Sequence, residues 1–349
     1  MFATQSALEA VVFDPQRVSE AEWVALWTFR NRIRTERCPT DPPESLACFK
    51  EDTTRRRPFL DRPVWAVWNE QGDVLAYAAA WIEHMDTNQH IGDIDLAVLP
   101  EYRRQGLSRL LLAVLAERMA RENRRLVMGP SFSTIPAGAA WWQHIGGTLG
   151  LTEQVNQLVI ADLDRDMLRL WQERAAERAP GFELVSWEGA YPDADLPELA
   201  AMYAAMNHAP HGDLDVEDWT LTPEQLKEQE AAMVERDERR WTFAVRESAT
   251  GKIAGFTEMH WNPLRPEFLW QWGTAVWPEY RNLGLGRWLK AATLDHVLAQ
   301  RPEPIFVRTG NANTNAAMLK INEELGFRVI MSEGWWQLEL AELQAYLTT

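Results

Sequence analysis

The sequence has little cysteine, and this shortage already excludes one class of protein. Cys38 and Cys48 are the only two cysteines among 349 residues, and they permit one bridge at most. A secreted scaffold held by several disulfides is therefore excluded, and a reducing cytoplasm is the expected location. No group of Cys and His residues has the spacing of zinc ligands, so we expect no metal.

Long apolar runs are also missing. No stretch approaches the roughly 18 apolar residues that a membrane-spanning helix needs. The first ten residues, MFATQSALEA, lack the basic region and apolar core of a secretory signal. We therefore expect neither a signal peptide nor a membrane partner.

Positive charge is scarce: 35 Lys and Arg face 51 Asp and Glu, which gives a net charge of −16. Because surface cations drive phosphate binding, this balance argues against a nucleic-acid partner. The one basic run, Arg55-Arg56-Arg57, is too short to change that and is expected to be a solvated loop. An acidic protein instead favours cationic small molecules such as amines.

What the sequence does contain is a repeat. LPEYRRQGLSRLLL (99–112) and WPEYRNLGLGRWLK (277–290) stand 178 residues apart, and nine of fourteen positions are identical between 98–111 and 276–289. Identity at this density and at one offset indicates two copies of one fold. The chain length predicts two domains as well, at about 150 residues per domain.

The same elements surround each copy of the repeat. A strand–turn–strand pattern precedes it (65–81 and 243–259), and an amphipathic helix and a further apolar strand follow it. We therefore predict two similar α+β domains in tandem. The expected division is 1–160 for the N-terminal domain, 161–181 for a charged connecting helix, and 182–349 for the C-terminal domain.

The repeated glycine loop is typical of an anion site. In a strand, Arg-x-x-Gly-x-Gly and helix arrangement, glycines let the backbone approach a ligand and its N–H groups point inward. The helix N-terminus favours negative charge, and Arg281 and Arg287 can add counter-charge. A tight turn that merely requires glycine is the alternative for either copy taken alone. The P-loop and the dinucleotide fingerprint do not fit, because neither glycine pattern is present.

Two blocks carry a family resemblance. Val276-x-Pro278-x-x-Arg281-x-x-Gly284-x-Gly286 resembles the coenzyme A pyrophosphate loop of the GNAT superfamily of N-acetyltransferases, and TGNANTNAAMLKINEELGF (309–327) resembles the block that follows it there. With the repeat, the resemblance covers most of the chain and is similar to the tandem, mycothiol-synthase-like arrangement. It implies that each domain has a mixed, mostly antiparallel sheet flanked by helices.

The resemblance also implies an activity and its ligands. Acetyl-CoA would donate its acetyl group to a primary amine of a small, cationic acceptor, by direct attack of the amine on the thioester. Diphosphate oxygens would lie on the amides of 283–286, and the strand end would pair with the pantetheine arm. The residues so assigned to the coenzyme are Ala275, Val276, Arg281, Asn282, Leu283, Gly284, Leu285, Gly286, Arg287, Asn311, Asn315 and Asn322, with Arg103, Arg104, Gly106 and Ser108 in the first copy.

Acetyl transfer needs a base to deprotonate the amine, and Glu258 is the first choice. Strand alternation places it on one face with Ala254, Phe256 and His260, where apolar neighbours would raise its pKa. His260 is the reserve base. A solvated strand edge, with Glu258 paired to an arginine, is the alternative.

The general acid is open. Many GNAT relatives carry a tyrosine five positions before the final Phe of the second block, and here that position is Asn322. An asparagine cannot donate an acidic proton, although its amide can hydrogen-bond a sulfur. Either water or a residue from elsewhere would protonate the departing thiolate.

The first copy looks poorly equipped for chemistry. The position that corresponds to Glu258 is Ala80, and the asparagine-rich block has become SFSTIPAGAAWWQHIGG (131–147). We therefore expect the N-terminal domain to be non-catalytic while it keeps a coenzyme-type loop. A catalytic N-terminal domain that uses Glu83 remains the alternative.

The acceptor site is expected in the segment 206–219, with His208, His211 and Asp213 as substrate-binding residues, because carboxylates suit a cationic acceptor. A solvated acidic loop that caps the next helix explains the segment equally well. Two other functions remain beside the acetyltransferase: a non-catalytic acyl-CoA or ligand-binding tandem GNAT module, and an aminoacyltransferase that uses charged tRNA. The negative charge argues against the latter. The acceptor's identity and the oligomeric state stay open.

Overall fold

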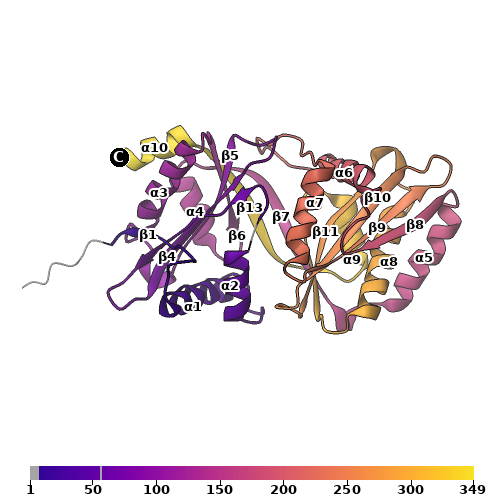
Figure 1. Ribbon diagram of the computed structural model, residues 1–349, viewed down its shortest axis with the longest axis horizontal. Helices are drawn as coiled ribbons and strands as arrows, with labels where there is room; N and C mark the ends of the chain where they lie inside the picture. The colour runs from indigo at the N-terminus through magenta and orange to yellow at the C-terminus, as the bar shows by residue number, and fades with distance from the viewer. Residues whose placement is uncertain (1–7, 56) are drawn as a thin grey trace, which may run out of the picture. The chain divides into compact units, whose positions relative to one another are not determined.

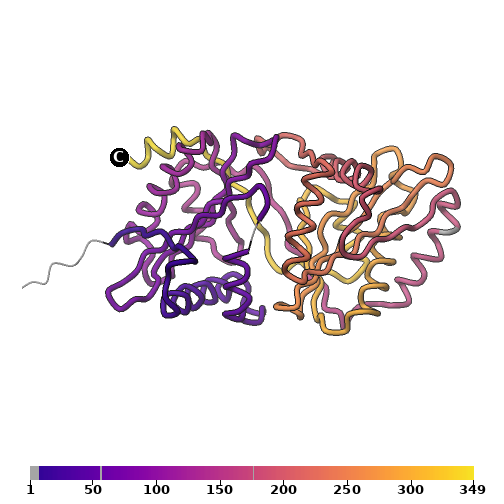
Figure 2. The backbone as a smooth tube through the Cα atoms, in the orientation of Figure 1, coloured from indigo at the N-terminus to yellow at the C-terminus, as the bar shows by residue number. Residues whose placement is uncertain are grey.

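The computed structural model describes residues 8–55 and 57–349, so most of the N-terminal decapeptide and Arg56 lie outside it. The chain forms two compact units (Figures 1 and 2). The first contains the described residues through Leu151 together with Asp213–Asp215 and Glu333–Thr349; the second contains Thr152–Gly212 and Val216–Ser332. Each unit combines one sheet with helices, as the sequence predicts.

The sheet of the first unit has the strand order β1-β3-β4-β5-β6-β13, with β2 paired to β4. Only β5 and β6 run parallel; the other neighbours are antiparallel. The strands are β1 Ala10–Val12, β2 Leu60–Asp61, β3 Val64–Trp68, β4 Val74–Glu83, β5 Ile91–Val98, β6 Leu126–Phe132 and β13 Arg328–Glu339, and the helices are α1 Glu20–Arg37, α2 Leu46–Thr54, η1 Pro100–Tyr102, α3 Leu107–Arg121, α4 Pro136–His144 and α10 Leu340–Thr348.

The second unit repeats this plan with the strand order β8-β9-β10-β11-β12-β7. Again one pair alone, β11 and β12, is parallel. The strands are β7 Thr148–Val159, β8 Phe182–Glu188, β9 Arg239–Glu247, β10 Ile253–Trp261, β11 Phe268–Val276 and β12 Phe306–Ala312, and the helices are η2 Ile160–Asp162, α5 Arg165–Arg178, α6 Leu196–Tyr203, η3 Ala204–His208, α7 Pro223–Val234, η4 Pro278–Tyr280, α8 Leu285–Gln300 and α9 Ala316–Glu324.

The two units exchange their last strands. Residues 153–159 of β7, which end the first repeat, pair with β12 of the second unit. Residues 333–339 of β13, which end the second repeat, pair with β6 of the first unit. The structure therefore divides the chain differently from the simple boundaries drawn from the sequence, because the segment from Glu333 onward completes the first unit.

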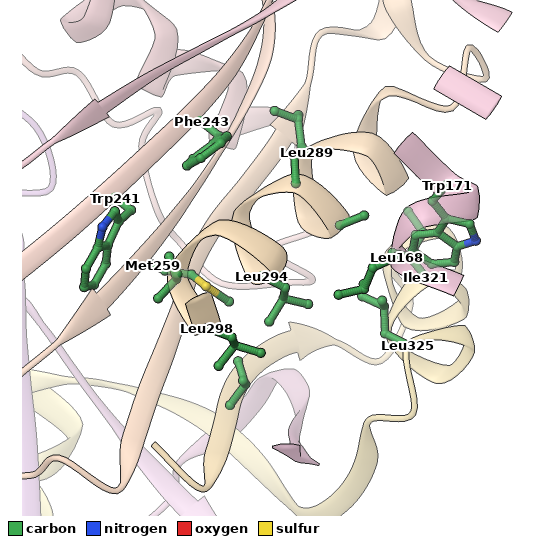
Figure 3. Packing of buried hydrophobic residues seen from close by; sticks show 14 of the residues in the cluster. Leu168, Trp171, Trp241, Phe243, Met259, Leu289, Leu294, Leu298, Ile321 and Leu325 are labelled. Carbon is green, nitrogen blue, oxygen red and sulfur yellow. The ribbon is translucent and has the colours of Figure 1, made fainter. Parts of the chain in front are cut away.

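The segment 161–181 forms part of the second unit's core. Leu168 and Trp171 of α5 belong to one buried cluster with Leu289 and Leu294 of α8 and Met259 of β10 (Figure 3). The apolar spacing of α8 predicts this buried face, since residues four apart lie on one side of a helix. The segment expected as a connecting helix is therefore packed against the helix that follows the second glycine loop.

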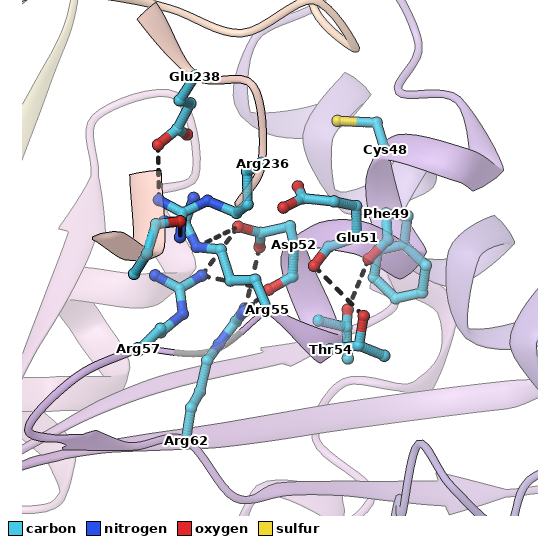
Figure 4. A network of polar contacts seen from close by, with 12 residues as sticks. Cys48, Phe49, Glu51, Asp52, Thr54, Arg55, Arg57, Arg62, Arg236 and Glu238 are labelled. Atoms are coloured by element: carbon cyan, nitrogen blue, oxygen red, sulfur yellow. Dashed lines mark hydrogen bonds and ion pairs between the residues drawn. The ribbon is translucent and has the colours of Figure 1, made fainter. Parts of the chain in front are cut away.

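The basic run of the first unit is partly neutralised by Asp52 at the end of α2 (Figure 4). Asp52 accepts hydrogen bonds from Arg57 at 2.8 Å and from Arg62 at 3.0 Å. Burial alone would raise the pKa of this carboxyl, but Arg62, Arg57 and Arg55 outweigh burial and lower it to about 2. Arg55 and Arg57 thus belong to an ion-pair cluster rather than to a free cationic patch, while Arg56 lies outside the described residues.

Among the described residues, no helix is long and apolar enough to cross a membrane. These residues also contain no group of three or more His, Cys, Asp or Glu side chains that could hold a metal ion.

Candidate active site

The parallel strands at the centre of the second unit separate after a short paired stretch. β11 and β12 pair only from Phe268 with Phe306 to Trp270 with Arg308. Beyond this point the facing edge of β11 carries N–H and C=O groups that the register leaves unpaired, while the other edge of β12 stays paired with β7. Such an open edge can accept an extended chain by backbone hydrogen bonds.

The glycine loop follows directly from this edge. Arg281 ends η4, and the next residues, Asn282 (φ 65°) and Gly284 (φ 86°), both adopt the left-handed conformation before α8 begins. The amides of 282–286 have no hydrogen-bond acceptor among the residues that the structure describes. Successive unpaired amides at a helix N-terminus form a concave site for an anion.

The first unit repeats the loop geometry. Arg104 (φ 63°) and Gly106 (φ 82°) take the same conformations before α3, and within the described chain the amides of 104–108, including that of Ser108, likewise have no acceptor. Both loops therefore have the same backbone conformation and the same series of unpaired amides.

The arginines of the two loops are partly engaged within the protein. Arg281 Nε donates to the carbonyl of Val276 at 3.1 Å, and Arg103 Nε donates to that of Val98 at 3.0 Å, so each arginine fastens its loop to the preceding strand. Arg287 binds Glu324 of α9 through two hydrogen bonds of 2.8 and 3.0 Å. Glu324 thus offsets part of the counter-charge that Arg287 is expected to offer.

Glu258 lies buried in the middle of the sheet, between β9 and β11, with 5% of its surface exposed. Its Oε1 accepts hydrogen bonds from Tyr203 at 2.6 Å, Tyr191 at 2.9 Å and Thr242 at 3.0 Å. The expectation of purely apolar neighbours is therefore wrong, because hydroxyl groups surround the carboxylate. The solvated strand edge of the alternative is wrong as well, because Glu258 is buried, whereas the arginine partner that it expected is present as Arg240.

A buried ion pair lies next to this carboxylate. Arg240 pairs with Glu230, and its Nε lies 4.0 Å from Glu258. The Arg240 guanidinium stacks 3.7 Å above the Tyr191 ring. Burial, strengthened by the negative charge of Glu258, raises the pKa of Tyr191 and of Tyr203 well above the usual range, so both phenols stay protonated and donate.

The second oxygen of Glu258 is available for chemistry. No partner for Oε2 is found within 8–55 and 57–349, whereas Oε1 is held by three hydroxyls. A carboxylate fixed at one oxygen and open at the other can accept a proton from a substrate in a defined direction. His260 lies next to this site and packs on Trp272 with ring centres 5.3 Å apart. Burial lowers the pKa of His260, so its imidazole is neutral near pH 7, as the predicted role of reserve base requires.

A β-bulge in β11 lies opposite Glu258. Thr257 pairs with Thr274 but Met259 pairs with Gln271, so β11 holds one extra residue there, around Gly273. Bulges re-aim backbone groups and are frequent next to active sites. Met206 Sδ of η3 would lie 3.0 Å from a Cβ added at Gly273, so η3 covers the bulge closely.

The first unit lacks these features. Its β4 and β5 pair without a register shift from Ala76 to Trp81, and Ala80 is fully buried opposite Ile94. Glu83 is exposed at the end of β4, where it pairs with Leu60 of β2. The first unit therefore keeps the glycine loop but has no carboxylate at the position that corresponds to Glu258.

Three polar side chains meet on the other side of the second unit's sheet. Asn322 Nδ2 donates to Asn311 Oδ1 at 2.6 Å, and Lys290 Nζ donates to Asn322 Oδ1 at 2.7 Å. Lys290 and Asn322 are each only 1% exposed. Burial lowers the pKa of the Lys290 ammonium to about 7. Asn322, assigned to the coenzyme by resemblance, is thus held between β12 and α8, and Asn315 caps α9 by accepting from the Met318 amide at 3.3 Å.

Stability should report the Lys290 pKa. The folded-state pKa, about 7, lies below the unfolded value of about 10.4. Between these values the unfolded chain binds more protons, so the free energy of unfolding rises with pH by up to about 1.4 kcal/mol per unit. We expect this rise between pH 7 and 10 in the parent and its loss in Lys290→Met, measured by urea unfolding. Equal slopes for the two proteins would contradict the burial argument.

The predicted acceptor residues are not brought together in one unit. His208 lies in η3 and packs edge-on against Trp277, with ring centres 5.5 Å apart, and His211 is exposed; both belong to the second unit. Asp213 belongs to the first unit, where its amide donates to Gly150 and its carbonyl accepts from Gln337. Its neighbour Asp215 forms an ion pair with Arg125.

Several residues of the site escape sequence reasoning. Tyr191, Tyr203, Thr242 and Arg240 come from four separate positions and converge on Glu258 only in the fold. The sequence did carry one signal. Two of its six tyrosines, Tyr191 and Tyr203, lie shortly before the predicted acceptor segment 206–219. Lys290 carried no comparable signal.

Each half of the chain matches a known protein family. The description "Acetyltransferase (GNAT) family" matches residues 23–131, and "Acetyltransferase (GNAT) domain" matches 190–328. No curated protein sequence matched.

Solved structures share the fold. A tandem GNAT protein from the clavulanic acid biosynthesis pathway, determined without AcCoA, has a TM-score of 0.73 at 23% identity and covers 96% of this chain and 99% of its own. A GCN5-related N-acetyltransferase from Sphaerobacter thermophilus has a TM-score of 0.65 at 14% identity, over 95% and 96% of the two chains. The glucosamine N-acetyltransferase region of a fungal multi-domain GH3 β-N-acetylglucosaminidase has a TM-score of 0.66 at 14% identity, over 95% and 38%. The chain therefore belongs to the GNAT family of acetyltransferases and carries two such domains in tandem.

Proposed function

We propose that the second unit transfers the acetyl group of acetyl-CoA to a primary amine of a small, cationic acceptor. Acetyl-CoA-dependent acetyl transfer is the general activity of this family. The observation that carries the proposal for this chain is Glu258, a buried carboxylate with one oxygen held by three hydroxyls and the other open.

The residues present fit the coenzyme. The unpaired amides of 282–286 suit a diphosphate, and the free edge of β11 suits an extended pantetheine arm. When bound, acetyl-CoA supplies an electrophilic thioester carbonyl. The bulge at Gly273 would turn a backbone N–H towards the developing oxyanion, and Glu258 Oε2 would accept the amine proton.

The charge of the site supports a cationic acceptor. Glu230, Arg240 and Glu258 form a buried group with a net charge of −1 when both carboxyls are ionised. An ammonium that enters next to Glu258 would balance this charge, and the acidic protein as a whole would attract it. His208 and His211 remain proposed acceptor contacts from the second unit. We also propose a cytoplasmic location, because a chain with only two cysteines cannot build the disulfide framework typical of small secreted proteins.

A thiol-release assay tests the proposal directly. The purified chain is incubated with acetyl-CoA and a panel of primary amines, amino acids and polyamines, and free coenzyme A is measured. We expect turnover with at least one cationic amine and acetylation of its nitrogen by mass spectrometry. Tight acetyl-CoA binding without turnover across the panel would favour the non-catalytic binding module instead.

A further inference from the structure

Lys290 is an unusual residue for the core of an α+β unit. It is 1% exposed on α8, and its ammonium group donates a hydrogen bond to Asn322 and lies 5.5 Å from the centre of the Phe327 ring. Among the described residues it has no carboxylate partner. A buried ammonium without a counter-ion opposes folding, so packing alone does not account for it.

The first unit shows that the fold does not require this residue. Helices α3 and α8 correspond at an offset of 178 residues, which aligns Lys290 with Leu112, a fully buried leucine. Strand β6 and helix α4 correspond to β12 and α9 at an offset of 180, which aligns Asn322 with Trp142 and Asn311 with Ser131. Where one unit packs Leu and Trp, the other has a buried polar chain.

The polar chain of Lys290, Asn322 and Asn311 lies at a similar distance from the glycine loop as the bulge where the reaction is proposed. At about 1.5 Å per residue, Lys290 is ~7 Å along α8 from the glycine loop. At about 3.3 Å per residue, the bulge at Gly273 is ~10 Å back along β11 from its end at Val276. Both distances are measured from the same loop, and Asn311 lies on the part of β12 that no longer pairs with β11.

Base and lysine approach from opposite faces of the sheet. Phe256 and the Glu258 carboxylate contact Tyr203 of α6. The alternate residues Met259 and Trp261 join the cluster built on α8, the helix that carries Lys290. Successive strand residues point to opposite faces, so one face offers a proton acceptor and the other a proton donor.

We propose that Lys290, positioned by Asn322 and Asn311, protonates the coenzyme thiolate as it departs. This rests on the proposed acetyl transfer and supplies its missing acid. The acceptor nitrogen bonds to the acetyl carbon, the carbon–sulfur bond breaks with its electron pair on sulfur, and that sulfur takes a proton from Lys290. The amine proton goes to Glu258, and water reprotonates Lys290. Transfer from an ammonium of pKa about 7 to a thiolate of pKa about 8.5 is favourable.

Coenzyme binding tests the sulfur contact without turnover. By calorimetry, the parent is expected to bind coenzyme A about tenfold more tightly than desulfo-coenzyme A, which lacks the thiol, as a hydrogen bond to a charged group provides. Lys290→Met should abolish this preference and leave desulfo-coenzyme A binding unchanged. Lys227→Met, at an exposed lysine paired with Asp193, should keep the preference.

Turnover supplies the second readout. We expect Lys290→Met to lower kcat by about 10- to 100-fold, with KM for acetyl-CoA within about threefold, because a thiolate needs less help than an alkoxide. Lys290→Arg should not restore kcat, since a guanidinium does not release its proton. Circular dichroism shows whether each variant is folded. If Lys290→Met is unstable, the kcat of Lys290→Arg is the measurement that decides.

Three results would overturn the inference. They are an unchanged thiol preference in a folded variant, parent-like kcat in Lys290→Met, or an acetyl group found on Lys290 itself. If the parent binds the coenzyme but turns over no amine, the proposed function fails, while the desulfo-coenzyme A comparison still decides whether Lys290 contacts the sulfur.

Discussion

Glu258→Gln is expected to slow thiol release about 10²- to 10⁴-fold at saturating amine, the range that a positioned general base contributes. Glutamine keeps the oxygen that accepts from Tyr191, Tyr203 and Thr242, so the hydroxyl cluster has its acceptor. It replaces the open oxygen with an amide nitrogen, which cannot accept a proton. We therefore expect kcat to fall while coenzyme affinity stays within about twofold.

The matched control is Glu83→Gln, which makes the same chemical change on the corresponding central hairpin of the first unit, at an exposed position. Its kcat should equal that of the parent. Parent-like kcat in a folded Glu258→Gln would remove Glu258 as the base, and His260→Gln would then be the next variant to measure. A large loss in Glu83→Gln would instead assign chemistry to the first unit.

Gly286→Asp is expected to weaken acetyl-CoA binding about 10- to 10³-fold. The added carboxylate would stand beside the amides of 283–286, where a diphosphate is expected. At about 4 Å, two like charges repel by about 1 kcal/mol in water and about 4 kcal/mol at a protein surface. The fold should tolerate the change, because an added Cβ meets only Ile321 Cδ1, at 3.4 Å.

Ser108→Asp is the control that the repeat itself provides, since Ser108 occupies the corresponding position after Gly106. Calorimetry on both variants counts sites as well as affinity. We expect Gly286→Asp to remove the site that supports turnover and Ser108→Asp to leave thiol release unchanged. If Gly286→Asp binds and turns over as the parent does, the diphosphate lies elsewhere.

Sequence periodicity predicted the parts of the site that are local in the chain. The glycine loop, its left-handed residues and the helix after it all fall within 277–300, so one stretch of sequence specifies them. The surroundings of Glu258 are different, because Tyr191 and Tyr203 are 67 and 55 residues away along the chain. Apolar alternation places Glu258 on the correct face but cannot reveal hydroxyl donors contributed by α6 and by the segment before it.

Lys290 and the strand exchange escaped prediction for separate physical reasons. A lysine beside Leu289 in an amphipathic helix normally extends its charged end into water, so sequence cannot distinguish a buried one. The exchange is hidden because β7 and β13 are equivalent strands of two similar repeats. Either strand satisfies either sheet edge by pattern alone, and only the coordinates show which edge each completes.

The exchanged strand has a consequence for synthesis on the ribosome. The sheet of the first unit needs 333–339 beside β6, and these residues are translated after all the strands of the second unit. The second unit receives its extra strand, 153–159, before its other strands are made. The half that emerges first cannot close its sheet until 333–339 have been made, so a chain stalled before them would leave β6 with a bare edge that can recruit other nascent chains.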